Sequence, residues 1–168
     1  MLPAYLEANQ IRTDLKEDKK GTAFQFYGMD EQVKPEGKDC TSVDIQFGAQ
    51  SSQFTYDTEK MVYAKQINNT PQTDGKTGEQ LTFTNVFVLE TDISVRDEVG
   101  HKKLDWDGSE NSRGYYISNG GVQEIHWAKS PNDETSYLAF YDKSGKEIKI
   151  NRGKTYIALN YRDKVTFK

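Results

Sequence analysis

The sequence contains a single cysteine, Cys40, and only two histidines in 168 residues. One cysteine permits no internal disulfide and cannot hold a zinc ion alone. A cysteine nucleophile would need a histidine partner, and the chain offers only His101 and His126. Cys40 lies at the edge of a strand pattern, KDCTSVDIQF, so we interpret it as a small buried or half-buried thiol.

Long apolar runs and an excess of basic residues are also missing. No stretch of 18 or more apolar residues occurs, which excludes a transmembrane helix. The net charge is −4 and the basic residues are dispersed, whereas nucleic-acid-binding proteins carry a basic face or stripe. We therefore expect no nucleic-acid partner. The opening MLPAYLEANQIRTDL has no basic segment followed by an apolar run, so we see no signal peptide and interpret Met1 as the start of a truncated chain.

Aromatic residues are plentiful. They make up 12% of the chain, with ten Tyr and eight Phe, which argues against disorder although the mean hydropathy is −0.85. In the run VDIQF, Val43, Ile45 and Phe47 point one way and the polar residues the other, as in an antiparallel sheet covered on one face. Alternation of this kind, bounded by turn residues, predicts strands at Ala23–Tyr27, Ser42–Phe47, Phe54–Asp57, Met61–Gln66, Leu81–Glu90, Lys102–Asp105, Gly114–Ser118, Gln123–Lys129, Tyr137–Tyr141, Glu147–Ile150, Thr155–Asn160 and Lys164–Phe167.

One helix is predicted, at the N-terminus. Pro3 suits a first helical turn, Leu2 and Leu6 share a face, and Gly21 is a plausible stop. We therefore expect a helical lead-in over residues 1–22 and one β-rich domain over 23–168, because the length suits a single core. The predicted fold class is mainly β, an antiparallel sheet or a two-layer sandwich with one short N-terminal helix. Hairpin turns are predicted at residues 119–121 and 143–146.

Two local patterns suggest sites, and each has a simpler interpretation. Asp105, Asp107 and Asn111 put oxygen ligands in one loop, which calcium favours, but the spacing of an EF-hand is missing and a solvated acidic turn is the better interpretation. His126 and Trp127 lie in a strand pattern. If Trp127 faces the core, His126 and Glu124 face outward together, as an acid–base pair, a metal site or, more commonly, an ordinary strand-surface pair.

The segment 63–88 is the most distinctive part of the chain. Strand parity puts Tyr63 and Lys65 on one face. Asp74 and Thr77 can close a tight turn in a long polar loop over residues 68–79, with a glycine at positive φ after them. Asn85 interrupts an apolar strand, and since a buried amide needs partners we expect it to brace the preceding loop.

These residues also resemble the C-terminal half of the YerB-like bacterial lipoprotein family. The matching motifs are Tyr63-x-Lys65, Asp74-x-x-Thr77-Gly78, Asn85-Val86, Gly114-Tyr115-Tyr116, Gly120, Ile125 to Lys129, Asp142 with Gly145, and Asn151-x-Gly153-Lys154-Thr155-Tyr156-Ile157. The stretch 4–26 is similar to the segment that links the two halves of such proteins. The resemblance implies a secreted protein of α+β fold at full length, lipid-anchored at the outer face of the cytoplasmic membrane, with an N-terminal half and no assigned molecular function. Two positions depart from the family pattern: Lys65 stands where arginine is common and Gln72 where histidine is common.

Two functional hypotheses follow. The first is a non-catalytic binding or structural module outside the cytoplasm, with the family's N-terminal domain, cell-wall glycan or another envelope protein as partner, and with a lipid anchor as the only link to the membrane. Its expected functional surface comprises Tyr63, Lys65, Asp74, Thr77, Asn85, His126 and Trp127. The second is a hydrolase-type or metal-dependent envelope enzyme with a site around Asp74. Its site either brings Lys65, Tyr63 and His126 together with Asp74 in a cleft or is completed only by a missing N-terminal domain. No catalytic residue is assigned, and calcium is the one cofactor considered.

Overall fold

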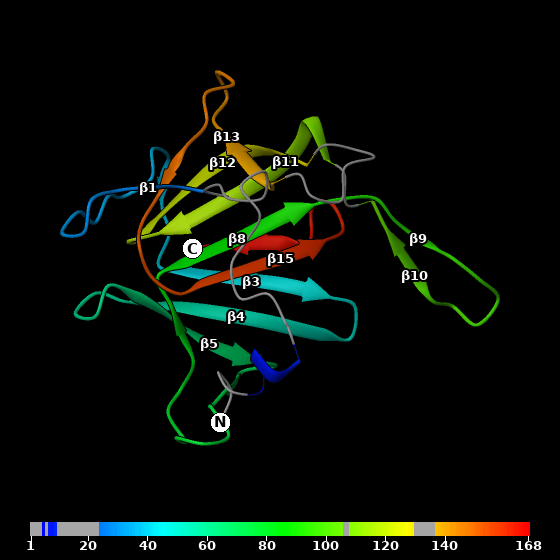
Figure 1. Ribbon diagram of the computed structural model, residues 1–168, viewed down its shortest axis with the longest axis horizontal. Coiled ribbons are helices and arrows are strands. Elements are labelled where there is room, and N and C mark those ends of the chain that lie inside the picture. Colours follow the sequence, from blue (N-terminus) through cyan, green and yellow to red (C-terminus); the bar gives the residue numbers. More distant parts are fainter. Residues whose placement is uncertain (1–4, 6, 10–23, 106–107, 130–136) are drawn as a thin grey trace.

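A computed structural model describes residues 5, 7–9, 24–105, 108–129 and 137–168, and within them the chain is almost entirely β (Figure 1). Tyr5, Glu7 and Ala8 are helical, and the N–H of Asn9 donates to the Tyr5 carbonyl at 3.1 Å. The rest of the predicted N-terminal helix lies outside the described residues. No helix in the described part of the chain is long and apolar enough to cross a membrane. The strands are β1 (Gln25–Phe26), β2 (Lys38–Asp39), β3 (Ser42–Phe47), β4 (Gln50–Asp57), β5 (Val62–Ile67), β6 (Thr70–Pro71), β7 (Thr82–Phe83), β8 (Asn85–Glu90), β9 (Ile93–Val95), β10 (Lys102–Leu104), β11 (Gly108–Ser118), β12 (Gly121–Ala128), β13 (Ala139–Tyr141), β14 (Lys149–Ile150), β15 (Thr155–Asn160) and β16 (Val165–Phe167).

Two large sheets form the body of the molecule. The first sheet has the order β13-β12-β11-β8-β15, with β2 also paired to β12. The second sheet has the order β16-β3-β4-β5-β6, with β7 also paired to β5. The hairpin of β9 and β10 projects away from both sheets, and β1 forms a short parallel pair with β14 (Figure 1). The predicted mainly β class is therefore confirmed, and the strands are divided between two large sheets.

The predicted strand 81–90 is wrong in one respect, because the chain leaves one sheet for the other at Thr84. β7 pairs with β5 in the second sheet, whereas β8 pairs with β11 and β15 in the first. Gly153 lies against this crossing, with a φ of +142°, and a Cβ at that position would lie 2.0 Å from Thr84 Oγ1. The N–H groups of Thr84 and Asn85 both donate to the Lys154 carbonyl, at 2.9 and 3.1 Å. β8 and β15 therefore start side by side and run parallel to each other. Most other strand pairs of the two sheets are antiparallel.

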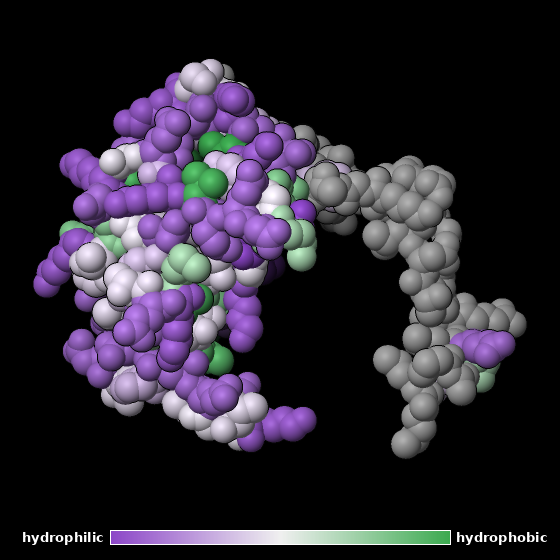
Figure 2. All heavy atoms as spheres, turned by 90° about the vertical axis from the view of Figure 1, so that its left-hand side faces the viewer, coloured by the Kyte–Doolittle hydropathy of each residue, from purple (hydrophilic) through white to green (hydrophobic). Residues whose placement is uncertain are grey.

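Two apolar clusters lie on opposite faces of the first sheet. One fills the space between the sheets and includes Ile45, Phe54 and Val88. The other includes Phe87 and Trp127 and is covered by partly buried apolar side chains from residues 24, 138 and 148. β8 is buried at every position because it has a core on each side. Figure 2 shows a face of the molecule on which hydrophilic side chains dominate and hydrophobic ones are scattered, as expected when most apolar side chains are held in these two clusters.

The turn between β11 and β12 fixes the register of these strands. Asn119 has a φ of +43° and Gly120 one of +72°, the pair of positive angles that a two-residue type I′ hairpin requires. Ser118 and Gly121 face each other directly across it. The predicted hairpin at residues 119–121 is confirmed. The second predicted turn is confirmed as well, with Gly145 at a φ of +83°.

Candidate functional site

A groove of about 820 Å³ lies between strands of the first sheet and the edge of the second. Its floor comes from β11 and β12, and one wall comes from β16, the edge strand of the second sheet. The other walls are the segment leading into β2 and the turn after β13. This β12 groove is lined by Glu36, Gly37, Lys38, Tyr115, Val122, Gln123, Glu124, Asp142, Lys143, Ser144 and Phe167.

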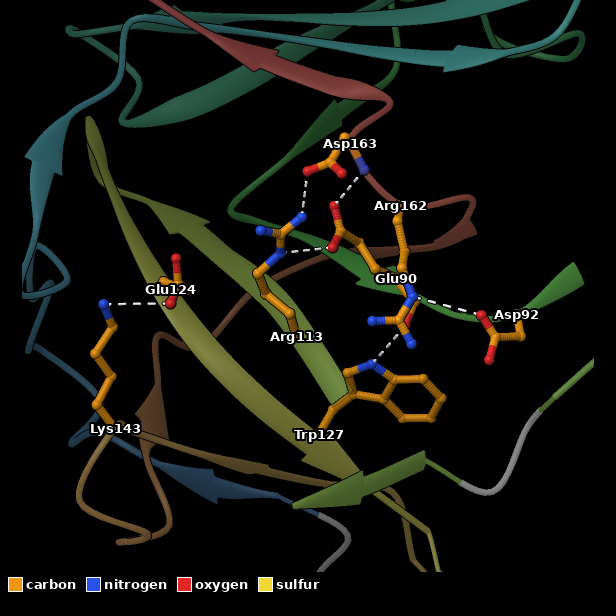
Figure 3. A network of polar contacts seen from close by, with 8 residues as sticks. All are labelled: Glu90, Asp92, Arg113, Glu124, Trp127, Lys143, Arg162 and Asp163. Carbon is orange, nitrogen blue, oxygen red and sulfur yellow. Dashed lines mark hydrogen bonds and ion pairs between the residues drawn. The ribbon is translucent and has the colours of Figure 1, made fainter. Parts of the chain in front are cut away.

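Aromatic and charged side chains share the groove. The rings of Tyr115 and Phe167 have their centroids 4.9 Å apart and are tilted by 58°. Glu124 is the cross-strand neighbour of Tyr115, and Lys143 Nζ lies 3.2 Å from Glu124 Oε1 (Figure 3). Both members of this ion pair are substantially exposed, so it contributes little stability and can be exchanged for contacts to a ligand. Asp142 shapes the wall, because its carboxylate accepts hydrogen bonds from Ser144 Oγ at 2.6 Å and from two turn N–H groups.

An ion-pair network around the buried carboxylate of Glu90 lies beside the groove (Figure 3). Glu90 Oε2 accepts a hydrogen bond from Arg113 Nε at 2.6 Å, while Glu90 Oε1 accepts one from the N–H of Asp163 at 2.9 Å. The guanidinium also bonds the Asp163 carboxylate and lies 5.8 Å from the Tyr115 ring centroid. The hydrogen bond to Glu90 contributes most to raising the pKa of Arg113 above its ordinary value. Because the Arg113 guanidinium pairs with both Glu90 and Asp163, its role is to hold the end of β8 against β11.

His126 and Trp127 point to opposite faces of β12. Trp127 is fully buried and its indole N–H donates to the Glu90 carbonyl at 3.2 Å. The expectation that Trp127 belongs to a functional surface is therefore wrong, because strand alternation turns it into the core. His126 is half-buried, and its Nδ1 has no hydrogen-bond partner among the described residues. Glu124 lies on the same face of β12, but its carboxylate pairs with Lys143 rather than with His126.

Tyr63 and Lys65 lie on one face, as expected, but that face is the core side of β5. Tyr63 is fully buried and its hydroxyl donates to the Cys40 carbonyl at 2.9 Å; burial raises the pKa of this tyrosine. Lys65 is 6% exposed, its Nζ donates to Gln72 Oε1, and it lies 5.0 Å from the Tyr156 ring centroid. Burial lowers the pKa of Lys65. Neither residue belongs to a surface, and Gln72 is the acceptor that holds the Lys65 amine.

Asp74 and Thr77 form the predicted turn. Asp74 Oδ1 accepts hydrogen bonds from the N–H groups of Thr77 and Lys76, both at 2.9 Å, and Gly78 follows with a φ of +72°. These bonds, the one from Thr77 first, hold the pKa of the Asp74 carboxyl below its usual range. Both residues are exposed, on a loop of the second sheet, whereas His126 lies in the first. The structure thus gives Asp74 a turn-forming role.

Asn85 is a buried junction rather than a surface residue. Its Nδ2 donates to the Asn151 carbonyl at 2.8 Å and to Thr155 Oγ1 at 3.1 Å. Its Oδ1 accepts hydrogen bonds from the Tyr116 hydroxyl at 3.1 Å and from Ser118 Oγ at 3.0 Å. Asn85 braces another part of the chain, as expected, but the prediction of which part is wrong. Asn85 holds residues 151–155, ahead of β15, and not the loop over residues 68–79.

The calcium prediction falls mostly on residues that the structure leaves out. Asp107 and the side chain of Asn111 lie outside the described part of the chain. Asp105 follows β10, and its N–H donates to the Asp92 carbonyl at 2.9 Å. Within the described ranges, no three His, Cys, Asp or Glu side chains gather closely enough to hold a metal ion.

Sequence reasoning missed most of the β12 groove. Glu124 was considered only as a neighbour of His126, while Tyr115 entered only through a family motif and Phe167 only as a strand residue. The groove combines segments that are far apart in the chain, from residue 36 to residue 167. The one available signal is the alternation of β11 and β12, which puts Tyr115 and Glu124 on the same face.

The comparisons with known proteins agree with this fold. The crystal structure of YerB protein from Bacillus subtilis superposes with a TM-score of 0.73 at 17% identity, covering 99% of this chain and 52% of that one. A protein named "Putative lipoprotein YerB", from Bacillus subtilis strain 168, is 25% identical over 107 residues, which are 64% of this chain and 30% of the relative. The chain thus spans about half the length of the structure that it matches. The family model described as "Protein of unknown function (DUF3048) C-terminal domain" matches residues 43–157. More than half of the chain lies in that match, and the chain therefore belongs to the DUF3048 C-terminal domain family.

Proposed function

We propose that this chain is a non-catalytic binding module of a bacterial lipoprotein, located outside the cytoplasm and tethered to the membrane by a lipid anchor elsewhere in the full-length protein. The β12 groove is its binding site, and cell-wall glycan is its ligand. The similarity to a protein named as a lipoprotein supports the location. The main support for the binding function is the chemistry of the groove.

The groove has the chemistry that a sugar ligand requires. Tyr115 and Phe167 offer aromatic surface on which the C–H groups of a sugar ring can pack. Glu124 and Lys143 supply donors and acceptors for hydroxyl groups. Its volume of about 820 Å³ lies within the range of small-molecule sites. An open groove lined in this way suits a chain of sugars better than a compact metabolite.

A hydrolytic site around Asp74 has weaker support. The Asp74 carboxylate is taken up by turn N–H groups, and Tyr63 and Lys65, proposed to act with it, are buried. General acid–base chemistry needs groups within hydrogen-bond reach of one substrate, and in the described residues no hydrogen bond joins Asp74 to Lys65 or His126. A site shared with the N-terminal half of the protein would be detected by measuring hydrolysis in the two-domain protein.

Titration of the ¹⁵N-labelled chain with soluble wall-glycan fragments tests the binding function. We expect chemical-shift changes confined to β11, β12, β16 and the turn after β13. Tyr115→Leu should weaken binding about tenfold because it removes the ring on which the sugar packs. Tyr161→Leu, at an exposed tyrosine outside the groove, is the matched control and should leave binding unchanged. An absence of shifts at millimolar fragment would refute the glycan function.

A further inference from the structure

The outer edge of β16 carries backbone groups that no strand pairs with. Lys168, directly after β16, exchanges two hydrogen bonds of 3.0 Å with Ser42, so it points toward β3, and Thr166 does so in the same register. In an antiparallel pair alternate residues point to opposite sides, so Val165 and Phe167 point away from β3. In the described part of the chain, β16 pairs with β3 alone. The N–H and C=O groups of Val165 and Phe167 therefore remain open to a further strand.

This open edge faces the β12 groove. Phe167 of β16 contacts Tyr115 of β11, with ring centroids 4.9 Å apart, whereas Asn160 of β15 donates to the Gln46 carbonyl of β3 at 3.0 Å. β16 thus lies over β11, and β3 lies on the side of β15. The next position of the second sheet, beyond β16, lies over β12, and no strand of the described residues fills it. Because residues of β12 form the groove floor, the groove is the space of one missing strand.

An extended polypeptide matches the open groups of β16. In a β conformation the N–H and C=O groups of one residue point to the same side of the strand, and those of the next residue point to the other side. Two peptide residues, two positions apart, can therefore each exchange a pair of hydrogen bonds, one with Val165 and the other with Phe167. Addition of a strand to an exposed sheet edge is a common mode of peptide recognition.

The side chains along β16 indicate which peptide fits. Val165 and Phe167 pack against the apolar cluster between the sheets, whereas Lys164, Thr166 and Lys168 are exposed on the outer face. Neither lysine forms an ion pair with a residue of the described ranges. In an added strand, the residues opposite Val165 and Phe167 would face the groove floor, and those opposite the lysines would face solvent. Opposite charges on facing strands stabilise the pair, so apolar residues should alternate with acidic ones.

We propose that β16 binds an extended acidic segment of a partner protein, which pairs antiparallel with it and fills the β12 groove as the missing edge strand of the second sheet. This site goes beyond the proposed glycan-binding function and does not depend on it. A peptide over β12 covers Tyr115 and Phe167, so peptide and glycan would exclude each other from the groove. Each ligand is therefore tested in the absence of the other.

Titration of the ¹⁵N-labelled chain with a blocked pentapeptide, in which glutamate alternates with valine and occupies both ends, tests the backbone pairing. We expect the amide resonances of Val165 and Phe167 to move downfield, while that of Thr166, which already faces β3, moves little. The same peptide with both valine nitrogens methylated should bind about tenfold more weakly, because it lacks the two N–H groups that donate to β16. Equal binding of the two peptides, or no binding of the first at millimolar concentration, would overturn the proposal and leave the glycan result unaffected.

Charge reversal tests the preference for acidic residues. The chain should bind the glutamate peptide several-fold more tightly than a peptide with lysine in place of glutamate, and added salt should reduce this difference. Lys164→Glu combined with Lys168→Glu should reverse the order of the two peptides, and because both side chains are exposed the fold should be unaffected. An unchanged order in the double variant would overturn the acidic specificity.

Two variants at Val165 isolate one backbone bond. Val165→Pro and Val165→Ala both shorten the side chain, but only proline removes the outward N–H, and proline is tolerated on an edge strand where the N–H faces solvent. We expect the glutamate peptide to bind Val165→Pro several-fold more weakly than Val165→Ala, and equal binding would overturn the pairing. If Val165→Pro loses its dispersed spectrum, the methylated peptide on the unmodified chain decides the question.

Hydrogen exchange at the Val165 and Phe167 amides identifies other occupants of the edge. In the free chain both amides should exchange fast, because they have no partner strand among the described residues, and the glutamate peptide should slow them. Slow exchange that disappears on dilution would make the occupant a second copy of the chain. Slow exchange in the two-domain protein alone would make it the N-terminal half. Either result would overturn the proposal of a partner peptide.

Discussion

Replacing Asn85 with alanine should be among the most destabilising single changes at a polar position of this chain. The side chain is completely buried and makes four hydrogen bonds, two as donor and two as acceptor. Alanine leaves the Asn151 carbonyl without this donor and the Tyr116 hydroxyl without this acceptor. Each orphaned buried group costs about 1–3 kcal/mol, so we expect the free energy of unfolding to fall by about 3 kcal/mol. That is a large part of the 5–15 kcal/mol typical of a domain.

Urea unfolding followed by tryptophan fluorescence measures this loss, because Trp127 is buried in the same sheet. The midpoint should fall while the slope of free energy against urea stays constant, as expected if only stability changes. Asn85→Leu keeps a side chain of similar volume but makes none of the four hydrogen bonds, and so separates hydrogen bonding from the cavity. Gln50→Ala, at an exposed position of β4, is the control and should change stability by less than about 0.5 kcal/mol. A loss below about 1 kcal/mol in Asn85→Ala would show that the network is not needed.

Three further predictions concern buried or crowded positions. Burial lowers the pKa of Lys65, so the charged amine destabilises the folded chain below that pKa, and this penalty is relieved as the pH rises toward the ordinary value of 10.5. Lys65→Met should therefore raise the free energy of unfolding at pH 7 by about 1 kcal/mol. In urea titrations at pH 10 this gain should be smaller. Burial raises the pKa of Cys40 to about 11, so its reaction with a disulfide reagent at pH 8 should be slow until urea unfolds the chain. Gly37→Ala would put a Cβ 2.1 Å from Val122 O, so we expect loss of the pairing between β2 and β12, measured by faster amide exchange at Lys38.

The alternation of apolar and polar residues along the sequence predicts most of the fold. Alternation in residues 42–47 and 155–160 gives the bounds of β3 and β15 as the structure has them. Asn119-Gly120 predicts a hairpin because few residues other than asparagine and glycine adopt two positive φ angles in succession. Alternation says nothing about which sheet a strand joins. The crossing at Thr84 was missed for this reason: an apolar run over residues 81–90 reads as one strand until Gly153 is seen beside it.

The candidate site was less predictable, because exposure depends on tertiary packing. Tyr63 and Lys65 were expected on a surface, but the first sheet covers that face of β5. A lysine can be buried there because Gln72 accepts its hydrogen bond and Tyr156 faces its charge. Asp74 was predicted well because its contacts are local, with backbone groups two and three residues away. Contacts within a few residues were readable from the sequence, and long-range contacts were not.

The separation of framework from groove makes the binding hypothesis testable without loss of the fold. The polar junction at Asn85 lies where β8, β11 and the segment before β15 meet, whereas Glu124 lies in the β12 groove. Its carboxylate takes part only in an exposed ion pair, so Glu124→Ala should leave the urea midpoint unchanged while it alters the groove. Asn85→Ala should show the reverse, with a lower midpoint and unchanged affinity below the transition. If affinity and stability fell together in both variants, the groove would be part of the framework, and loss of binding could no longer be assigned to contacts with the ligand.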